Sequence, residues 1–508
     1  MAQRSTKAQQ GAVTPITIKF DGGLNYSDSP THIADNELTR ALNVIYNSQT
    51  GTPETRPGTT CLTAAPLGSP ILKLYYYEKS LIAKWLVCAS GGKLYYQNGT
   101  SWTEIGSLAD STTVPSFLTF NSYLLIADGG TNLKKWDGIA LTSLSDGLSA
   151  TAIAEIGARV VINSESDPDL VTFSGVEDET MWDTADLTNP ALGLRAGFGD
   201  NMMVNGFAVF GSDLLVSKRG DSEKRIYRIN TADPTPTNWQ VARLTANNAA
   251  QNPHTLVSAF NNVFFVDNNG FKSIKGVTEY GDLQIDMVGA KVNTQFHQAV
   301  CDEVTYLPSL TSIWYLISER VYAYHRIYDA DGNLKHAFTD LQFQQGRITS
   351  IVQAGDTVYL AGYNGYLYKL DSFSSKDETA PDVFADYPCL VISKRFSMFG
   401  GGILRKTSLE LKALDVPGDT VAYLRANTVE RDGIVLKTIS ILSAAQALAD
   451  ATGDLSDAIE LLGDMSGSAW VETTTNRVRG TSLQFQVDSQ SGRFGLEGLQ
   501  AEVALVGS

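Results

Sequence analysis

The chain has 508 residues, of which 43% are hydrophobic and 19% are charged, and its formal net charge is −16 at pH 7. This composition is typical of a globular protein with a sizeable core, and the length predicts roughly three domains. The acidic balance excludes a protein that grips nucleic acid through a basic face, although nucleic acid could still slide past it.

The first seventy residues are predicted to be an arm with strands that dock on a C-terminal domain. Residues 1–14 are polar and lack the apolar core of a signal peptide. Residues 16–20 (ITIKF) and 41–47 (ALNVIYN) have strand composition. Residues 30–40 are expected to form a short helix, with Asp35, Asn36 and Glu37 as N-cap material.

A β-rich unit of three or four short strands then repeats about seven times, every 35 to 55 residues. In each copy an apolar strand, a turn and a second strand follow one another. The clear copies are 84–102, 120–138, 261–276 and 356–371, and the looser ones are 158–175, 212–230 and 311–329.

Asn-Gly pairs mark two of the predicted hairpin turns, at Asn269-Gly270 and at Asn364-Gly365. Both residues of an Asn-Gly pair accept the positive φ that a two-residue type I′ turn needs. A lone hairpin is unstable in water, so each unit must pack on its neighbours. Repetition at this period predicts an all-β fold with a β-propeller of about seven blades over residues 71–371.

A change of character follows Asp371. Residues 372–388 are acidic and contain proline, so we expect a linker or exposed loop. Strand-like segments then resume, and residues 443–462 have apolar positions three or four apart, which predicts a helix. Residues 372–508 are therefore expected to form a β-sandwich-like domain, together with the N-terminal strands, that carries a short helical insertion.

The search for reaction chemistry finds no catalytic, metal or cofactor site. The four cysteines are scattered and predict reduced, mostly buried thiols: Cys61, Cys88, Cys301 and Cys389. The five histidines form no metal-binding motif: His32, His254, His297, His325 and His336. Asp329, Asp331 and Asn333 have calcium-loop spacing, but no Glu stands at the twelfth position, which favours a β-turn.

Three segments resemble tailed-phage virion proteins. The opening stretch FDGGLNYSDSPTHIADNELTRALNVIYNSQTGTPETRPGTT (20–60) is similar to their N-terminal pattern of "A.N", a turn and "RPG". Residues 171–186 resemble their "FS…W" segment, and residues 477–507 resemble their C-terminal strand pair. The nearest family is the tail nozzle, or DNA-stabilising tail protein, of short-tailed phages.

The resemblance implies a structural virion protein, not an enzyme, which assembles in the host cytoplasm. Six copies would form a ring below the portal and its head-to-tail adaptor proteins, retain the packaged double-stranded DNA and conduct it during ejection. Tail fibres or spikes are further expected partners. No membrane segment is expected, because no apolar stretch approaches the ~20 residues that span a bilayer.

The interpretation as a tail nozzle leads to candidates for a channel gate, and one alternative function stays open. If DNA is retained by steric closure, then the hairpin tips Asn268-Asn269-Gly270 and Asn364-Gly365 are candidates for the channel gate. The alternative hypothesis is a carbohydrate-binding or glycosidase-like propeller. It would need a pocket on the propeller axis with clustered arginines and, for hydrolysis, paired carboxylates.

Overall fold

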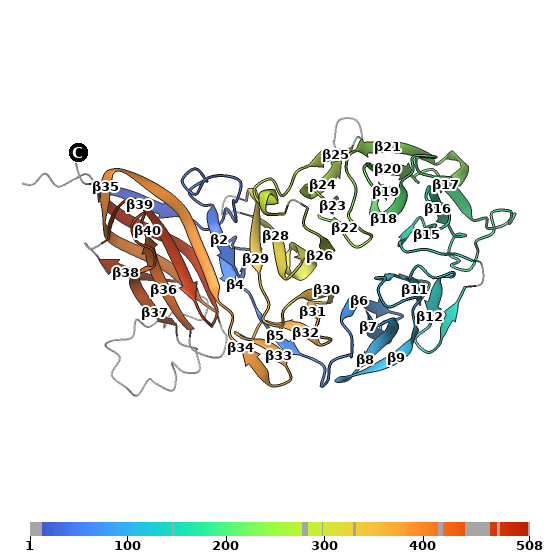
Figure 1. Ribbon diagram of the computed structural model, residues 1–508, viewed down its shortest axis with the longest axis horizontal. Helices are drawn as coiled ribbons and strands as arrows, with labels where there is room; N and C mark the ends of the chain where they lie inside the picture. Colours follow the sequence, from blue (N-terminus) through green and yellow to red (C-terminus); the bar gives the residue numbers. More distant parts are fainter. Residues whose placement is uncertain are drawn as a thin grey trace, which may run out of the picture.

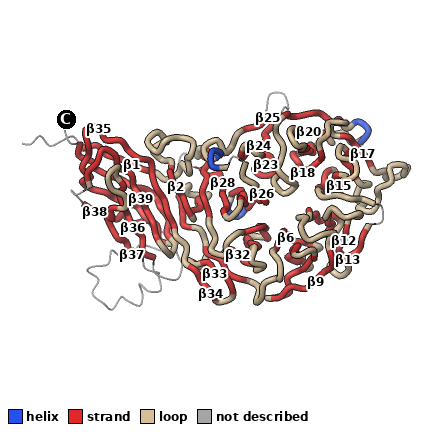
Figure 2. The backbone as a smooth tube through the Cα atoms, in the orientation of Figure 1, coloured by secondary structure: helices blue, strands red, loops and turns tan. Residues whose placement is uncertain are grey.

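The computed structural model describes residues 13–144, 147–276, 283–296, 298–328, 332–414, 420–441, 468–474 and 478–505. Strands dominate it, and they form a ring of small sheets beside a β-sandwich (Figures 1 and 2). Within these ranges the helical elements are three 3-10 turns: Pro236–Asn238, Asn293–Gln295 and Pro308–Leu310. No helix in the described ranges is long and apolar enough to cross a membrane.

The ring is a β-propeller of seven blades, as predicted. Blades one to three are β6 (Ile71–Glu78), β7 (Lys84–Ser90), β8 (Lys93–Asn98), β9 (Ser101–Ser107); β10 (Ser116–Phe120), β11 (Tyr123–Ala127), β12 (Lys134–Trp136), β13 (Leu141–Ser143); and β14 (Ile153–Ile156), β15 (Arg159–Asn163), β16 (Leu170–Phe173), β17 (Leu192–Arg195). Blades four and five are β18 (Met203–Phe210), β19 (Asp213–Arg219), β20 (Lys224–Asn230), β21 (Gln240–Ala246); and β22 (Leu256–Ala259), β23 (Asn262–Asp267), β24 (Gly270–Gly276), β25 (Leu283–Asp286). Blade six is β26 (Cys301–Leu307), β27 (Ser312–Ile317), β28 (Arg320–Tyr328) and β29 (Leu334–Leu341).

The seventh blade is completed by a strand from the other end of the chain. It contains β30 (Ile348–Ala354), β31 (Thr357–Gly362) and β32 (Leu367–Asp371), and its next strand is β5 (Gly58–Cys61). Cys61 pairs with Tyr368 and Gly58 with Asp371 in an antiparallel register. The N-terminal segment therefore closes the propeller ring as well as contributing to the other domain.

Separate apolar clusters fill the spaces between neighbouring blades. Tyr77 and Trp136 lie in the cluster between blades one and two. Ile71 and Leu367 belong to the cluster between blades one and seven, which closes the ring. Each blade is thus covered on both faces by the neighbouring blades of the ring, which explains how short hairpins become stable.

The second domain is a two-sheet β-sandwich organised by one long strand, β35 (Cys389–Ala413). The first part of β35 pairs with β2 (Leu38–Leu42) and β39 (Arg479–Ser489), and β39 pairs with β36 (Thr420–Asn427), which pairs with β37 (Ile434–Ile441). The later part pairs with β38 (Ser468–Thr474) and β40 (Phe494–Leu505), and β40 pairs with β1 (Val13–Ile18). β3 (Val44–Tyr46) pairs with β4 (Pro53–Thr55), which meets β40 at Gly495.

A buried arginine joins the two domains. Arg56 forms an ion pair with Asp377 at 2.5 Å, and both side chains are completely buried. Its guanidinium also lies over the rings of Phe343 and Tyr387, at 4.3 and 3.8 Å from their centroids. The Nε–H of Arg56 donates to Asn43, so the "A.N" and "RPG" elements of the opening segment meet at one point.

The predicted helix at residues 30–40 is wrong. The region up to Glu37 forms turns, and residues 38–42 form strand β2. The Glu37 carboxylate accepts hydrogen bonds from the Ala34 N–H and the Asn25 amide, so it stabilises a turn instead of a helix start. Pairing of β2 with β35, 350 positions away in the sequence, then outweighs local helix preference.

Two further expectations about the C-terminal region need correction. The presumed linker at 372–388 contains a hairpin, β33 (Asp377–Ala380) and β34 (Val383–Ala385), which extends the seventh blade beyond β5. The two strands expected in residues 477–507 are present as β39 and β40, but they do not pair with each other. Each of them pairs with β35 instead. The predicted helix at 443–462 and the residues Asp329 and Asp331 lie outside the described residues.

Candidate ligand site on the propeller axis

Four of the seven innermost strands have a β-bulge close to the point where they begin. Pairing between the first two strands of these blades skips one residue each time. The skipped residues are Leu72 of β6, Asn205 of β18, Asp302 of β26 and Thr349 of β30. A bulge redirects a side chain, and all four of these residues line one cavity on the propeller axis.

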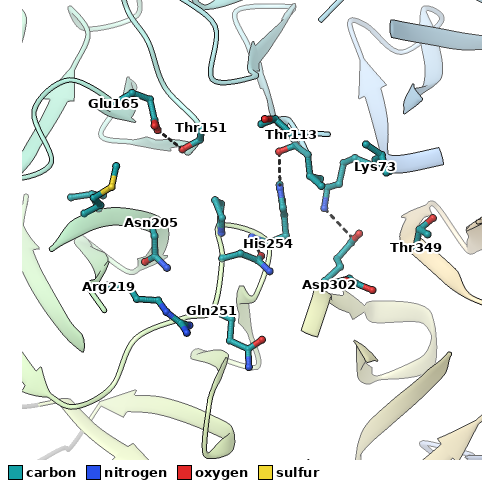
Figure 3. Close-up of a pocket in the computed structure, with 18 of the residues that line it drawn as sticks. Lys73, Thr113, Thr151, Glu165, Asn205, Arg219, Gln251, His254, Asp302 and Thr349 are labelled. Atoms are coloured by element: carbon teal, nitrogen blue, oxygen red, sulfur yellow. Dashed lines mark hydrogen bonds and ion pairs between the residues drawn. The ribbon is translucent and has the colours of Figure 1, made fainter. Parts of the chain in front are cut away.

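The cavity has a volume of about 760 Å³, which is within the range of small-molecule sites. It lies at the end of the propeller where the inner strands begin, and all seven blades or the loops preceding them contribute to its wall. Figure 3 shows polar and charged side chains directed into it from several sides. We call it the axial cavity.

Two ion pairs occupy one side of the axial cavity. The Lys73 ammonium lies 3.2 Å from Glu303, and Arg347 lies 2.7 Å from Asp302. Lys73 belongs to blade one and Glu303 to blade six, so this pair spans the seventh blade between them. The guanidinium of Arg347 also lies 5.7 Å from the ring of Tyr363.

The opposite side carries groups with unused hydrogen-bonding capacity. The Asn205 amide donates to the carbonyl of Ala250, but its Oδ1 is buried and accepts from no described group. Glu165 accepts from Thr151 and Asn163 through one oxygen, Oε1. The second carboxylate oxygen of Glu165 can therefore accept further hydrogen bonds from a bound molecule.

A second arginine of the cavity, Arg219, has no carboxylate partner among the described residues. Its Nη2 donates a hydrogen bond of 3.2 Å to the Asn268 Oδ1. Asp221 follows two positions later, in the turn between β19 and β20, and its carboxylate is exposed. The charged groups with spare capacity thus come from blades three and four, and Figure 3 shows Glu165 and Arg219 on the same side of the cavity as Asn205.

His254 is held in the wall as a neutral ring. Its Nε2 lies 3.3 Å from the carbonyl oxygen of Val114. Burial, with a further contribution from the positive charge of Lys73, lowers the pKa of His254 to about 3. The imidazole therefore adds no positive charge to the cavity near neutral pH.

The predicted gate residues lie in turns at the same end of the propeller. Asn268 and Asn269 connect β23 to β24, and Gly270 is already the first residue of β24. The connection around Asn364 and Gly365 spans four residues rather than two, because β31 ends at Gly362 and β32 begins at Leu367. Within this pair only Gly365 has a positive φ, of 83°, so the predicted type I′ turn is wrong.

The axial cavity itself was not predicted from the sequence. Its residues come from separate blades, and single polar positions at the start of a strand form no motif in the sequence. A weak signal was present, since Arg219-Gly220-Asp221 lies where β19 turns into β20 within the predicted unit 212–230, and Arg219 lines the cavity. Among the residues that the structure describes, no group of three or more His, Cys, Asp or Glu side chains could hold a metal ion.

No protein-family model matches this sequence, and no curated protein matches it. Similar solved structures include BamB from Moraxella catarrhalis, with 10% identity over 62% of this chain and 97% of that one, at a TM-score of 0.38. The extracellular domain of the putative hybrid two component system BT4673 from B. thetaiotaomicron has 12% identity over 76% of this chain, at 0.44, and the match covers 55% of its own length. The Myceliophteria thermophila Cps50 (Swd1) β-propeller domain has 12% identity over 61% of this chain and 98% of that one, at 0.40.

At these identities and TM-scores the likenesses add nothing about activity. The strand pairing within the chain defines its class, a seven-bladed β-propeller joined to a β-sandwich.

Proposed function

We propose that this chain is a structural protein of a short-tailed phage tail, of the nozzle type. The observation that carries the proposal is the position of Asn43 and Arg56. These residues belong to the opening segment that resembles the nozzle family, and they form the buried contact between propeller and sandwich. The resemblance therefore falls on residues that hold the architecture together.

A rigid two-domain body suits a subunit of a ring. Arg56 contacts the hairpin beside blade seven through Asp377, and the strand leading into the sandwich through Tyr387. Tyr387 in turn donates a hydrogen bond to the carbonyl oxygen of Arg56 at 2.5 Å. Such a closed network resists rotation of one domain against the other. In the proposed ring, six copies bind the head-to-tail adaptor and surround the channel.

The net charge of −16 supports a channel through which DNA passes without adhering. Phosphates release counterions when they bind lysine and arginine, whereas an acidic wall repels them over about one Debye length, ~8 Å at physiological salt. Retention of the genome then comes from steric closure.

The gate candidates would form a fixed rim in this proposal. Asn268 is held by Arg219, and Gly365 approaches the backbone of Leu67 so closely that an added Cβ would lie 2.4 Å from its carbonyl oxygen. An added Cβ at Gly270 would lie 2.1 Å from the Asn293 side chain. Each turn is therefore packed on its own subunit, and closure would come from narrowing of the ring.

Particles assembled without this chain test the proposal. They should package DNA and then lose it, so that the DNA becomes sensitive to added nuclease, and adding the purified chain before release should restore protection. Particles that retain nuclease-resistant DNA without the chain would contradict a role in genome retention.

A further inference from the structure

The axial cavity has the features of a binding site, and they are independent of the proposed tail role. Four inner strands have a bulge beside it, and each of the bulged residues faces the cavity: Leu72, Asn205, Asp302 and Thr349. A bulge interrupts a ladder of hydrogen bonds, and bulges concentrate next to functional sites. A packed propeller centre does not require four of them.

The free hydrogen-bonding capacity of the wall indicates what the ligand must offer. Glu165 accepts from Thr151 and Asn163 through Oε1 alone, so its second carboxylate oxygen has no described donor. Glu165 and Asp221 present carboxylate oxygens that no described cation pairs with. The ligand should therefore donate several hydrogen bonds.

The charge of the wall indicates that the ligand is neutral. Lys73 and Arg347 are neutralised by Glu303 and Asp302. Arg219 remains as a cation without a carboxylate partner, and it faces two carboxylates with spare capacity, those of Glu165 and Asp221. His254 is neutral, so the wall favours neither a strongly anionic nor a strongly basic molecule.

An aromatic ring completes the site. The Tyr363 side chain lines the cavity and is 54% exposed, although tyrosine usually buries most of its ring. A ring with a free face can cover the apolar C–H face of a sugar, while carboxylates and Arg219 bond to its hydroxyl groups.

We propose that the axial cavity binds a neutral oligosaccharide of two or three sugar units. Hydroxyl groups of the sugar donate to the carboxylates of Glu165 and Asp221, and Arg219 donates to a hydroxyl or ring oxygen. The proposal concerns binding alone.

Saturation-transfer NMR on the full chain tests the proposal with three neutral probes: maltotriose, cellotriose and tri-N-acetylchitotriose. The expected result is saturation transfer to at least one of them, with an affinity that falls at least tenfold in Arg219→Met. The matched control is Arg243→Met, because Arg243 is an exposed arginine on the outermost strand of the same blade. This control should bind as the wild type does.

Three outcomes would overturn the proposal. The first is no transfer to any of the three neutral probes at millimolar concentration. The second is binding that Arg219→Met and Asn205→Leu both leave unchanged, which would place the sugar elsewhere. The third is stronger binding of trigalacturonic acid or spermidine than of every neutral probe, which would show that the cavity selects a charged ligand.

Discussion

The guanidinium of Arg56 and the carboxylate of Asp377, 321 positions apart in the sequence, form a bidentate ion pair. Nη1 donates to Oδ1 at 2.9 Å and Nη2 to Oδ2 at 2.5 Å, with both side chains fully buried. Thr59 and the Gln344 N–H also donate to this carboxylate. The pair therefore connects the opening segment, blade seven and the chain entering the sandwich.

Breaking this pair from one side should be costly. Arg56→Met leaves the Asp377 carboxylate buried without its counter-ion, and loss of one partner of a buried pair costs about 3–5 kcal/mol. Urea unfolding followed by tryptophan fluorescence measures the loss. The double variant Arg56→Met with Asp377→Leu should recover part of it, because it removes the orphan charge.

The exposed pair of Lys84 and Glu78 is the control for that experiment. Lys84→Met should leave the unfolding midpoint unchanged, since exposed ion pairs contribute little. An Arg56→Met variant as stable as Lys84→Met would show that the buried pair does not hold the domains together.

Adding one methyl group at Gly58, in the strand β5 that closes the propeller, should lower the stability of the protein strongly. At Gly58 an added Cβ would lie 2.1 Å from the carbonyl oxygen of Lys376, a backbone atom that cannot move away easily. Gly58→Ala should destabilise the protein by about 1–3 kcal/mol, the cost of overpacking. Gly68→Ala is the same substitution at an exposed glycine with nothing within 4 Å, and it should change stability by less than about 0.5 kcal/mol. Equal melting temperatures for the two variants would contradict the close packing of Gly58 in β5 against the backbone of Lys376.

The buried His325 should make stability depend on pH in mild acid. Burial lowers the pKa of His325 to about 3, whereas a histidine in the unfolded chain titrates near its ordinary value of 6.5. Between these values the unfolded state binds more protons, so stability is complete above pH 6.5 and falls as the pH falls toward 3. The slope attributable to this one histidine is about 1.4 kcal/mol per pH unit.

Unfolding measured from pH 7 to pH 5 in wild type and His325→Leu isolates this effect. The substitution should reduce the slope of unfolding free energy against pH by up to about 1.4 kcal/mol per pH unit, the contribution of one proton. This change in slope is expected whatever the substitution does to stability at pH 7. His325 bonds to Thr339 through Nε2, while its Nδ1 has no described partner. An unchanged slope in His325→Leu would mean that the ring takes up its proton as readily in the folded protein as in the unfolded chain.

The cysteines should differ sharply in reactivity. Cys88, Cys301 and Cys389 are buried, and burial raises the pKa of each thiol; Cys61 is half-buried. A thiol reagent at pH 8 should therefore label Cys61 alone in the native protein and all four after denaturation. Labelling of a second cysteine at the rate of Cys61 would indicate local opening of a blade.

The proposed repulsive channel predicts weak binding to duplex DNA. The purified chain should bind poorly both at low and at physiological salt, with little dependence on salt. Tight binding that weakens steeply as salt rises would mean that basic groups line the path of the DNA, and would contradict the repulsive channel.

The blades were predictable because each consists of neighbouring strands joined by short turns. The strand β11 and its partner β10, for example, are separated only by Asn121 and Ser122. Pairing between distant parts was not predictable in this way. Nothing local marks Gly58–Cys61 as the partner of β32. Residues 38–40, the first part of β2, were predicted as the end of a helix because their strand partner lies about 350 positions away.

The axial cavity escaped prediction for a related physical reason. Whether Asn205 points into the cavity depends on a bulge, which is visible only when β18 is paired with β19. Arg219 and Glu165 line the same cavity because blades three and four are neighbours in the ring. No spacing within one segment encodes such an arrangement.

Electron microscopy of the purified chain, alone and mixed with head-to-tail adaptor proteins, tests the central claim most directly. If the chain is a tail nozzle, we expect rings of six copies on the adaptor around an open channel wide enough for duplex DNA. Each copy should show a propeller and a sandwich. Single particles that stay monomeric in the presence of the adaptor, or that assemble without a channel, would contradict it.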